Sequence, residues 1–157
     1  SFRYAFRKRR CLIPASGFYE WAKEEGQKQP YFIRLKNGSP MAFAGLWEEW
    51  TSTKGETRRT CVILTIAANS LMQEIHHRMP VILTPSSGAM WLDNSVGRSS
   101  PEKLLLPFSA DKMEAWRVSP KVSVPAFDNP DCFRKLEKGE APEKKPELPE
   151  AQASLFD

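Results

Sequence analysis

The feature that most constrains the fold is a series of short apolar runs, rich in β-branched and aromatic residues, which polar or turn-forming segments separate. The runs cover residues 11–14, 17–21, 31–35, 41–47, 60–66 and 79–83. Between them, residues 23–29 and 51–59 are polar, and Asn37-Gly38 is a typical two-residue hairpin turn. Runs of this length and composition predict strands, and short connections predict antiparallel pairing.

Short helices are expected between and after these strands. They cover residues 3–10, 69–77, 84–92 and 101–108. Asn69 is the expected N-cap of the second helix, and Thr84-Pro85 is expected to begin the third. Since no regular alternation of strand and helix appears, the sequence predicts an α+β domain with a mostly antiparallel sheet.

The chain has 157 residues, enough for one domain, and its composition changes near Glu137. Residues 1–136 are assigned to the folded domain, with a net charge of +7. Residues 137–157, rich in Glu, Lys and Pro with a net charge of −3, are expected to form a disordered tail. No apolar run reaches the ~20 residues that span a bilayer, which predicts a soluble protein without membrane partners.

The cysteines and histidines argue against a metal site. The three cysteines, Cys11, Cys61 and Cys132, lie far apart, and the two histidines are adjacent. This pattern fits a reducing cytoplasm and neither a disulfide framework nor a zinc site. We expect a cytoplasmic protein that needs no cofactor.

A basic segment at the start of the chain is interleaved with aromatic residues. Its basic members are Arg3, Arg7, Lys8, Arg9 and Arg10, and its aromatic members are Phe2, Tyr4 and Phe6. Basic groups that bind phosphates, alternating with aromatic rings that stack on bases, are typical of surfaces for single-stranded nucleic acid. A solvated helix face whose aromatic rings point into the core explains the pattern equally well.

Two titratable groups lie within these apolar runs. Strand alternation places Phe18 and Glu20 on one face, opposite Tyr19 and Trp21. If that face borders a cleft, Glu20 suits general acid–base chemistry; if it faces outward, Glu20 is an ordinary solvated carboxylate. The His76-His77 pair allows a similar choice, because histidines at the end of a helix also stabilise its dipole without any catalytic role.

The stretches at residues 10–21, 43–47 and 75–83 occur in an order and spacing that closely resemble the SOS response-associated peptidase (SRAP) family. Residues 65–69 and 118–122 fall where that family has similar segments, so the resemblance covers residues 1 to about 133. It implies the fold of that family, an α+β domain whose mostly antiparallel sheet forms a barrel-like core.

The resemblance also implies a function in DNA damage. Members recognise abasic sites, preferentially in single-stranded DNA, and attach to them covalently. The nucleophile is a cysteine that becomes the first residue after autocatalytic removal of the initiator Met. Its amine forms a Schiff base with the aldehyde of the ring-opened sugar, and its thiol then closes a thiazolidine ring.

Individual residues match the family's motifs. Glu20 matches the active-site glutamate, which acts in Met removal and in proton transfer during crosslinking, and His76 matches a histidine that promotes sugar-ring opening and crosslink reversal. Thr65 and Arg78 match residues placed against the DNA backbone, and we expect Arg3, Arg7 and Arg10 to extend this DNA-binding set. No family role matches His77.

The chain also departs from the family pattern. It lacks the Met-Cys-Gly-Arg start and the Asn-Ala-Arg-x-Glu segment, and Cys11 has no free α-amine with which to replace the nucleophile. We therefore expect an N-terminally incomplete domain that does not crosslink DNA by itself. The alternatives are a non-covalent module for damaged or single-stranded DNA and, less favoured, a general peptidase.

The end of the tail resembles the pentapeptide with which bacterial repair proteins bind the sliding clamp. It reads Gln152-Ala153-Ser154-Leu155-Phe156, and a disordered tether suits such docking. A chance sequence is the alternative. The expected partners are therefore abasic single-stranded DNA and, through Gln152, Leu155 and Phe156, a bacterial sliding clamp; the protein itself is expected to be a nucleoid-associated monomer.

Overall fold

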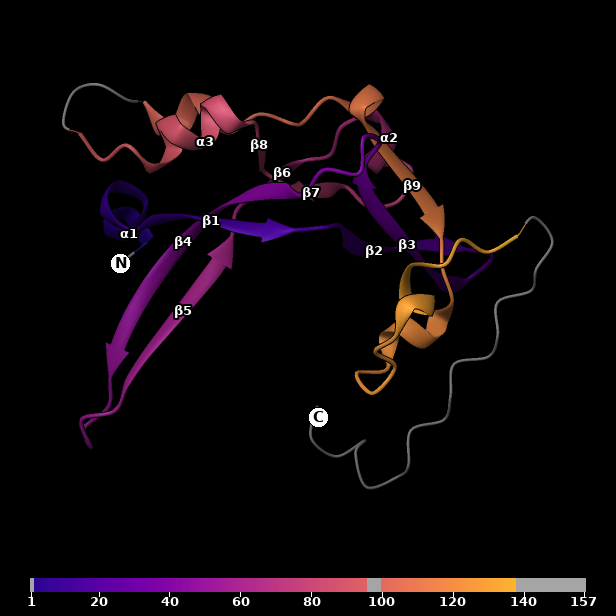
Figure 1. Cartoon of the computed structure of the whole chain (residues 1–157), viewed down its shortest axis with the longest axis horizontal. Coiled ribbons are helices and arrows are strands. Elements are labelled where there is room, and N and C mark those ends of the chain that lie inside the picture. Colours follow the sequence, from indigo (N-terminus) through magenta and orange to yellow (C-terminus); the bar gives the residue numbers. More distant parts are fainter. Residues whose placement is uncertain (1, 96–99, 138–157) are drawn as a thin grey trace.

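The computed structural model describes residues 2–95 and 100–137, whose strands form three antiparallel sheets (Figure 1). The helices are α1 (Phe2–Lys8), α2 (Ser70–Gln73) and α3 (Pro85–Leu92). The strands are β1 (Arg10–Ala15), β2 (Phe18–Glu24), β3 (Gln27–Leu35), β4 (Met41–Thr51), β5 (Thr57–Ile63), β6 (Thr65–Ala67), β7 (Arg78–Pro80), β8 (Ile82–Leu83) and β9 (Met113–Arg117). Short 3₁₀ turns cover Pro101–Leu104, Ala110–Lys112, Pro120–Ser123 and Pro130–Phe133.

The prediction of an α+β fold with mostly antiparallel sheets is confirmed, but the expected barrel-like core is wrong. The first sheet has the strand order β1-β4-β5, and β8 also pairs with β4. The second sheet has the order β2-β3-β9, and the third is the pair β6-β7. Among the described residues, β5 ends the first sheet and β2 and β9 end the second, so the sheets do not close on one another.

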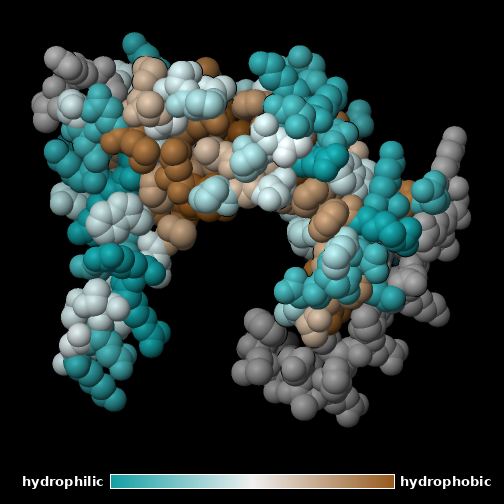
Figure 2. Space-filling view, viewed as in Figure 1, coloured by the Kyte–Doolittle hydropathy of each residue, from teal (hydrophilic) through white to brown (hydrophobic). Residues whose placement is uncertain are grey.

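Strand β4 joins the core to a projecting hairpin. Its first half is mostly buried and pairs with β1, whereas its second half pairs with β5 and becomes exposed toward Thr51. At Gly45, which pairs with both neighbours, a Cβ would lie 2.8 Å from Ile13 Cδ1 and 2.9 Å from Cys11 Sγ. A side chain larger than hydrogen therefore does not fit where the three strands meet. Past Glu48, which forms an ion pair with Arg9, the exposed end of the hairpin projects on one side of the hollow visible in Figure 2.

Two buried clusters form the core. One contains Ile33, Met41, Phe43, Ala68, Met72, Met79, Ile82 and Met113, and joins the β2–β3–β9 sheet to β4 and α2. The other contains Ala5, Ala44, Leu46, Val81, Leu83 and Trp91, and attaches α1 and α3 to the β1–β4 sheet. The unbranched thioether side chains of methionine suit the irregular space where short strands of different sheets meet.

The helices were predicted better at their starts than at their ends. The Asn69 side chain accepts a hydrogen bond from the Met72 amide, which confirms the N-cap, but α2 ends at Gln73 rather than at His77. Helix α3 has the predicted span, with Thr84 in a capping box with Ser87. Residues 101–108 contain only one 3₁₀ turn.

The single strand predicted over residues 60–66 is interrupted at Leu64. The Leu64 amide donates to the carbonyl of Ala44 at 2.9 Å, and the Leu64 carbonyl accepts from the amide of Val81 at 2.9 Å. Leu64 thus bonds both β4 and Val81, which lies between β7 and β8, and the chain leaves β5 there to begin β6.

The β2–β3–β9 sheet is covered on both faces. Ile33 and Met113 face the core, while Phe32 and Trp116 face the opposite side, where Phe32 contacts the ring of Phe133 at 6.0 Å between centroids. The Tyr19 hydroxyl donates to the carbonyl of Cys132 at 3.0 Å and ties the end of the domain to this face. The expected disordered tail lies almost wholly outside the described residues.

No helix among the described residues is both long and apolar enough to cross a membrane.

Candidate functional site

Strand β2 directs Glu20 toward the core side of its sheet. Phe18 contacts Phe43 with ring centroids 5.8 Å apart, whereas Tyr19 and Trp21 bond the C-terminal part of the domain on the other face. The predicted alternation is therefore confirmed. The Glu20 side chain is partly buried, and within residues 2–95 and 100–137 its carboxylate makes no hydrogen bond or ion pair. It is thus available to a substrate.

The segment between α2 and β7 fixes His76. The His76 amide donates to the carbonyl of Met72 at 2.7 Å, and the ring Nδ1 accepts from the Arg78 amide at 3.1 Å. The same Nδ1 lies 3.1 Å from the Arg78 carbonyl, so the Arg78 backbone engages it in either tautomer and leaves Nε2 as the nitrogen available for proton transfer. The ring of His77 lies against it, with centroids 4.4 Å apart.

Arg78 folds onto Thr65 across the β6–β7 pair. Its Nη2 donates to the Thr65 carbonyl at 2.5 Å and to Thr65 Oγ1 at 2.8 Å, and its Nε lies 3.3 Å from the same hydroxyl. A guanidinium has five donors, so this arrangement fixes its plane and leaves further donors for an anion. The structure therefore brings Thr65, His76 and Arg78 together in one exposed cluster.

Neighbours of Glu20 and of this cluster pack on the same part of the core. Ile75, the neighbour of His76, packs on the same buried cluster as Phe18 and Tyr31, the neighbours of Glu20 in its sheet. Burial, followed by the hydrogen bond to Glu24, raises the pKa of Tyr31, and the carboxylate of Glu74 adds a smaller effect in the same direction. Glu20 and His76 are thus supplied by adjoining segments, but no hydrogen bond joins them in the described part of the chain.

The basic segment separates into buried and exposed members. Arg10 is only 7% exposed, and its guanidinium donates to four backbone carbonyls, those of Phe6, Arg7, Trp91 and Asp93. Burial lowers the pKa of Arg10, and the nearby carboxylates of Asp93 and Glu102 oppose this effect. Because its donors are used inside the protein, we leave Arg10 out of the proposed DNA surface.

The other members of the segment lie on or beside α1. Arg3 and Arg7 are exposed, as are the rings of Phe2 and Tyr4, whereas Phe6 packs edge-on against Trp91. Arg9 forms an ion pair with Glu48 and lies over the rings of Tyr4 and Trp47. One aromatic ring of the segment, that of Phe6, therefore joins the core, while the rings of Phe2 and Tyr4 stay exposed on α1.

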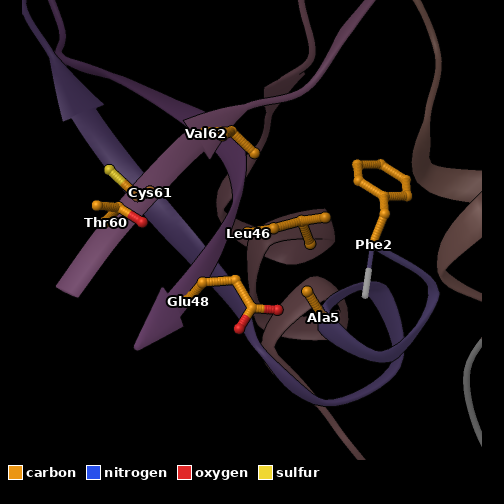
Figure 3. Close-up of a pocket in the computed structure, with 7 residues that line it drawn as sticks. All are labelled: Phe2, Ala5, Leu46, Glu48, Thr60, Cys61 and Val62. Carbon is orange, nitrogen blue, oxygen red and sulfur yellow. The ribbon is translucent and has the colours of Figure 1, made fainter. Parts of the chain in front are cut away.

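The pocket in Figure 3 lies away from the predicted site. It has a volume of about 340 Å³ and lies between α1 and the β4–β5 hairpin, lined by Phe2, Ala5, Leu46, Glu48, Thr60, Cys61 and Val62. Neither Glu20 nor the Thr65–His76–Arg78 cluster contributes to its lining.

The cysteines and the metal-binding side chains add no further centre. Cys11 is partly buried in β1, and burial raises the pKa of its thiol, which disfavours the reactive thiolate. Across residues 2–95 and 100–137, no group of three or more His, Cys, Asp or Glu side chains is arranged to hold a metal ion.

Comparison with known proteins decides the family. The model of the SOS response-associated peptidase (SRAP) family matches residues 1–125. The chain belongs to the SRAP family. The family membership expected from the motifs at residues 10–21, 43–47 and 75–83 is thereby confirmed.

The relatives of this SRAP chain include named proteins. It is 42% identical over 135 residues to the abasic site processing protein YoqW of Bacillus subtilis, a match that covers 85% of this chain and 60% of YoqW. It is 44% identical over 127 residues to YobE of the same bacterium, covering 80% and 58%. It is 32% identical over 152 residues to the abasic site processing protein HMCES of Gallus gallus, covering 83% and 45%. The SRAP chain thus spans about 60% or less of the length of these relatives.

A solved structure supports the fold. A protein from Bacteroides thetaiotaomicron superposes with a TM-score of 0.81 at 33% identity, covering 87% of this chain and 61% of that one.

The sequence patterns missed one group of polar residues in this SRAP domain. Glu24, Tyr31 and Arg117 form a bonded network on the same sheet face as Glu20. The signal that could have indicated it is the hairpin register, since a turn at Glu25-Gly26 places Tyr31 opposite Glu20.

Proposed function

We propose that the full-length protein is an abasic-site processing protein that crosslinks covalently to abasic sites in single-stranded DNA and shields them. The observation that carries this proposal is the Thr65–His76–Arg78 cluster, which shares its core support with a carboxylate, that of Glu20, that is unpaired among the described residues. The chain is also 42% identical to an abasic site processing protein. Here a proton-transfer group, an anion-binding group and a free carboxylate occur together, which is what capture of a phosphate-linked aldehyde requires.

The nucleophile in this proposal is a cysteine ahead of residue 1, exposed by autocatalytic hydrolysis of the bond to the initiator Met. Its α-amine attacks the aldehyde carbon of the ring-opened sugar, and loss of water gives an imine. The thiolate then adds to the imine carbon while the nitrogen takes up a proton, which closes a thiazolidine ring. No oxidant or reductant is needed.

Glu20 and His76 handle the protons of these steps. Glu20 accepts a proton from the attacking amine and returns one to the departing hydroxyl, and it also activates water for Met removal. His76, whose Nδ1 is held by the Arg78 amide, exchanges a proton with the sugar oxygen through Nε2, in ring opening and in reversal of the crosslink. These hydrolase-like and lyase-like steps are therefore assigned to two separate side chains.

Binding of the DNA backbone phosphates is assigned to arginine side chains. Arg78, oriented by Thr65, binds a phosphate next to the lesion, and Arg3 and Arg7 on α1 bind phosphates farther along the strand. The exposed rings of Phe2 and Tyr4 lie on the same helix and suit stacking on unpaired bases.

The same proposal includes the oligomeric state, the location and a protein partner. It acts as a monomer at the bacterial nucleoid, and Gln152, Leu155 and Phe156, which lie outside the described residues, bind the sliding clamp. The alternative of a non-covalent DNA-binding module is not favoured, because the relatives named above are processing proteins.

Incubation of the full-length protein with end-labelled abasic single-stranded DNA, followed by a denaturing gel, tests the proposal. We expect a slowly migrating covalent species that Glu20→Gln and His76→Ala form much more slowly. Glu25→Gln in the adjacent turn is the matched control for Glu20→Gln and leaves the rate unchanged. Binding on a native gel with no covalent species would favour the non-covalent alternative.

A further inference from the structure

A row of three polar side chains crosses the core-facing side of the β2–β3–β9 sheet. Glu20 on β2 lies directly opposite Tyr31 on β3, and Tyr31 lies directly opposite Arg117 on β9. Opposed residues of antiparallel strands project on the same face, so Tyr31 stands between the carboxylate and the guanidinium. Two strand spacings, ~9.5 Å, separate the outer two backbones. Extended Glu and Arg side chains together bridge such a span when nothing stands between them.

The guanidinium is directed along the sheet toward Glu24, not straight across it toward Glu20. The Tyr31 hydroxyl donates to Glu24 Oε1 at 2.6 Å, and Arg117 Nε lies 3.6 Å from Glu24 Oε2. Arg117 Nη2 donates to Gln29 Oε1 at 3.1 Å. Arg117 is therefore directed to Glu24 and Gln29 rather than to Glu20.

Gln29, which binds Arg117 at one end of this network, is firmly placed. Gln29 is 4% exposed, and its amide nitrogen donates to the carbonyls of Pro30 and Val118 at 2.8 and 2.9 Å, which directs its oxygen toward Arg117. Burial, followed by the hydrogen bond to Glu24, raises the pKa of Tyr31 to about 12. The hydroxyl thus remains a donor at neutral pH.

We propose that Tyr31 is a positioning residue for Glu20, whose ring keeps the Glu20 carboxylate apart from the Arg117 guanidinium. Of the two carboxylates on this face of β2, Glu24 is paired and Glu20 is not. An ion pair with Arg117 would hold Glu20 in its charged form and oppose every step in which it carries a proton. The remaining charged group that acts on Tyr31 is Glu74, after α2, whose effect opposes that of Arg117.

The inference rests on the role proposed above for Glu20, but its test does not depend on catalysis. Titration of ¹³C-labelled full-length protein by NMR gives the midpoint of the Glu20 carboxyl directly. Tyr31→Ala is expected to lower this midpoint by about 1 pH unit, because Arg117 then reaches the carboxylate. Tyr31→Ala combined with Arg117→Met restores the native midpoint, and Tyr31→Phe, which keeps the ring, preserves it.

Thermal unfolding of each variant verifies that it is folded, and Tyr31→Leu takes the place of Tyr31→Ala if the smaller side chain prevents folding. A midpoint that stays in place without the aromatic ring, or a shift that persists when Arg117 is also replaced, overturns the inference. If the midpoint moves as expected while the acid limb of the crosslinking rate does not follow, the positioning of Glu20 is supported and its proposed proton-transfer role is contradicted.

Discussion

Replacement of Arg10 by methionine separates a structural role from a DNA-binding role within one basic segment. The guanidinium donates to the carbonyls of Trp91, Asp93, Phe6 and Arg7 at 2.5, 2.6, 2.9 and 3.1 Å, and it also lies 5.5 Å from the centre of the Trp91 ring. It thereby joins the end of α1 to the end of α3. Arg10→Met keeps much of the side-chain volume but removes every one of these bonds.

The expected cost follows from the kind of bond that is lost. A hydrogen bond to a charged group contributes about 1.5–3 kcal/mol. Four such bonds are not additive, because water reaches some of the freed carbonyls. We therefore expect the free energy of unfolding to fall by about 3–4 kcal/mol. For a chain of this size that corresponds to a decrease of about 10 °C in Tm.

Urea unfolding of the full-length protein measures this cost, and a salt titration of its binding to single-stranded DNA measures the electrostatic contribution. Arg7→Met on the exposed face of α1 is the matched control. It is expected to change stability by less than about 0.5 kcal/mol and to reduce the slope of log K against log salt by about 0.7. The reasoning is refuted if Arg10→Met costs less than about 1 kcal/mol or reduces the salt slope as Arg7→Met does.

Three further predictions concern the sheets and the thiols. At Gly17, a Cβ would lie 2.2 Å from Phe32 Cζ, so Gly17→Ala is expected to cost about 2–3 kcal/mol in urea unfolding, and an unchanged midpoint would contradict the packing. Cys61 is exposed, whereas burial raises the pKa of the Cys11 thiol, so peptide mapping should show that a thiol reagent modifies Cys61 first. Cys11→Ala should leave DNA crosslinking intact. The pKa of Tyr31 is about 12 in the folded protein and about 10 when unfolded. Its contribution to stability is therefore complete below pH 10 and is lost between pH 10 and 12. Tyr31→Phe should remove this decrease from a plot of the free energy of unfolding against pH.

The elements that follow local rules were predictable from the sequence. The strands alternate or form apolar runs, and Asn69 and Thr84 cap their helices as their side chains allow. The face of Glu20 was also predictable, because alternation along β2 needs no knowledge of distant residues. The contact between Thr65 and Arg78 was not predicted, since nothing local indicates that β6 pairs with β7. The family resemblance only matched both residues to ones placed against the DNA backbone.

The features that depend on distant residues were not predictable in this way. Arg10 carries the signature of a DNA-binding arginine, yet two of its acceptors lie more than eighty positions away in the chain. The first hairpin was expected to have a polar loop at residues 23–29, whereas it turns sharply at Glu25 and Gly26, with φ of 48° and 81°. The shorter turn extends both strands and creates the row that contains Tyr31.

The central claim is that the full-length protein captures abasic sites through an N-terminal cysteine with the help of Glu20 and His76. Tandem mass spectrometry of the crosslinked peptide tests this claim most directly. The account predicts that abasic single-stranded DNA is attached to the first residue of a protein that has lost its initiator Met. It also predicts that none is attached to Cys11, Cys61 or Cys132. Attachment at one of these internal cysteines, or to a lysine, would contradict it.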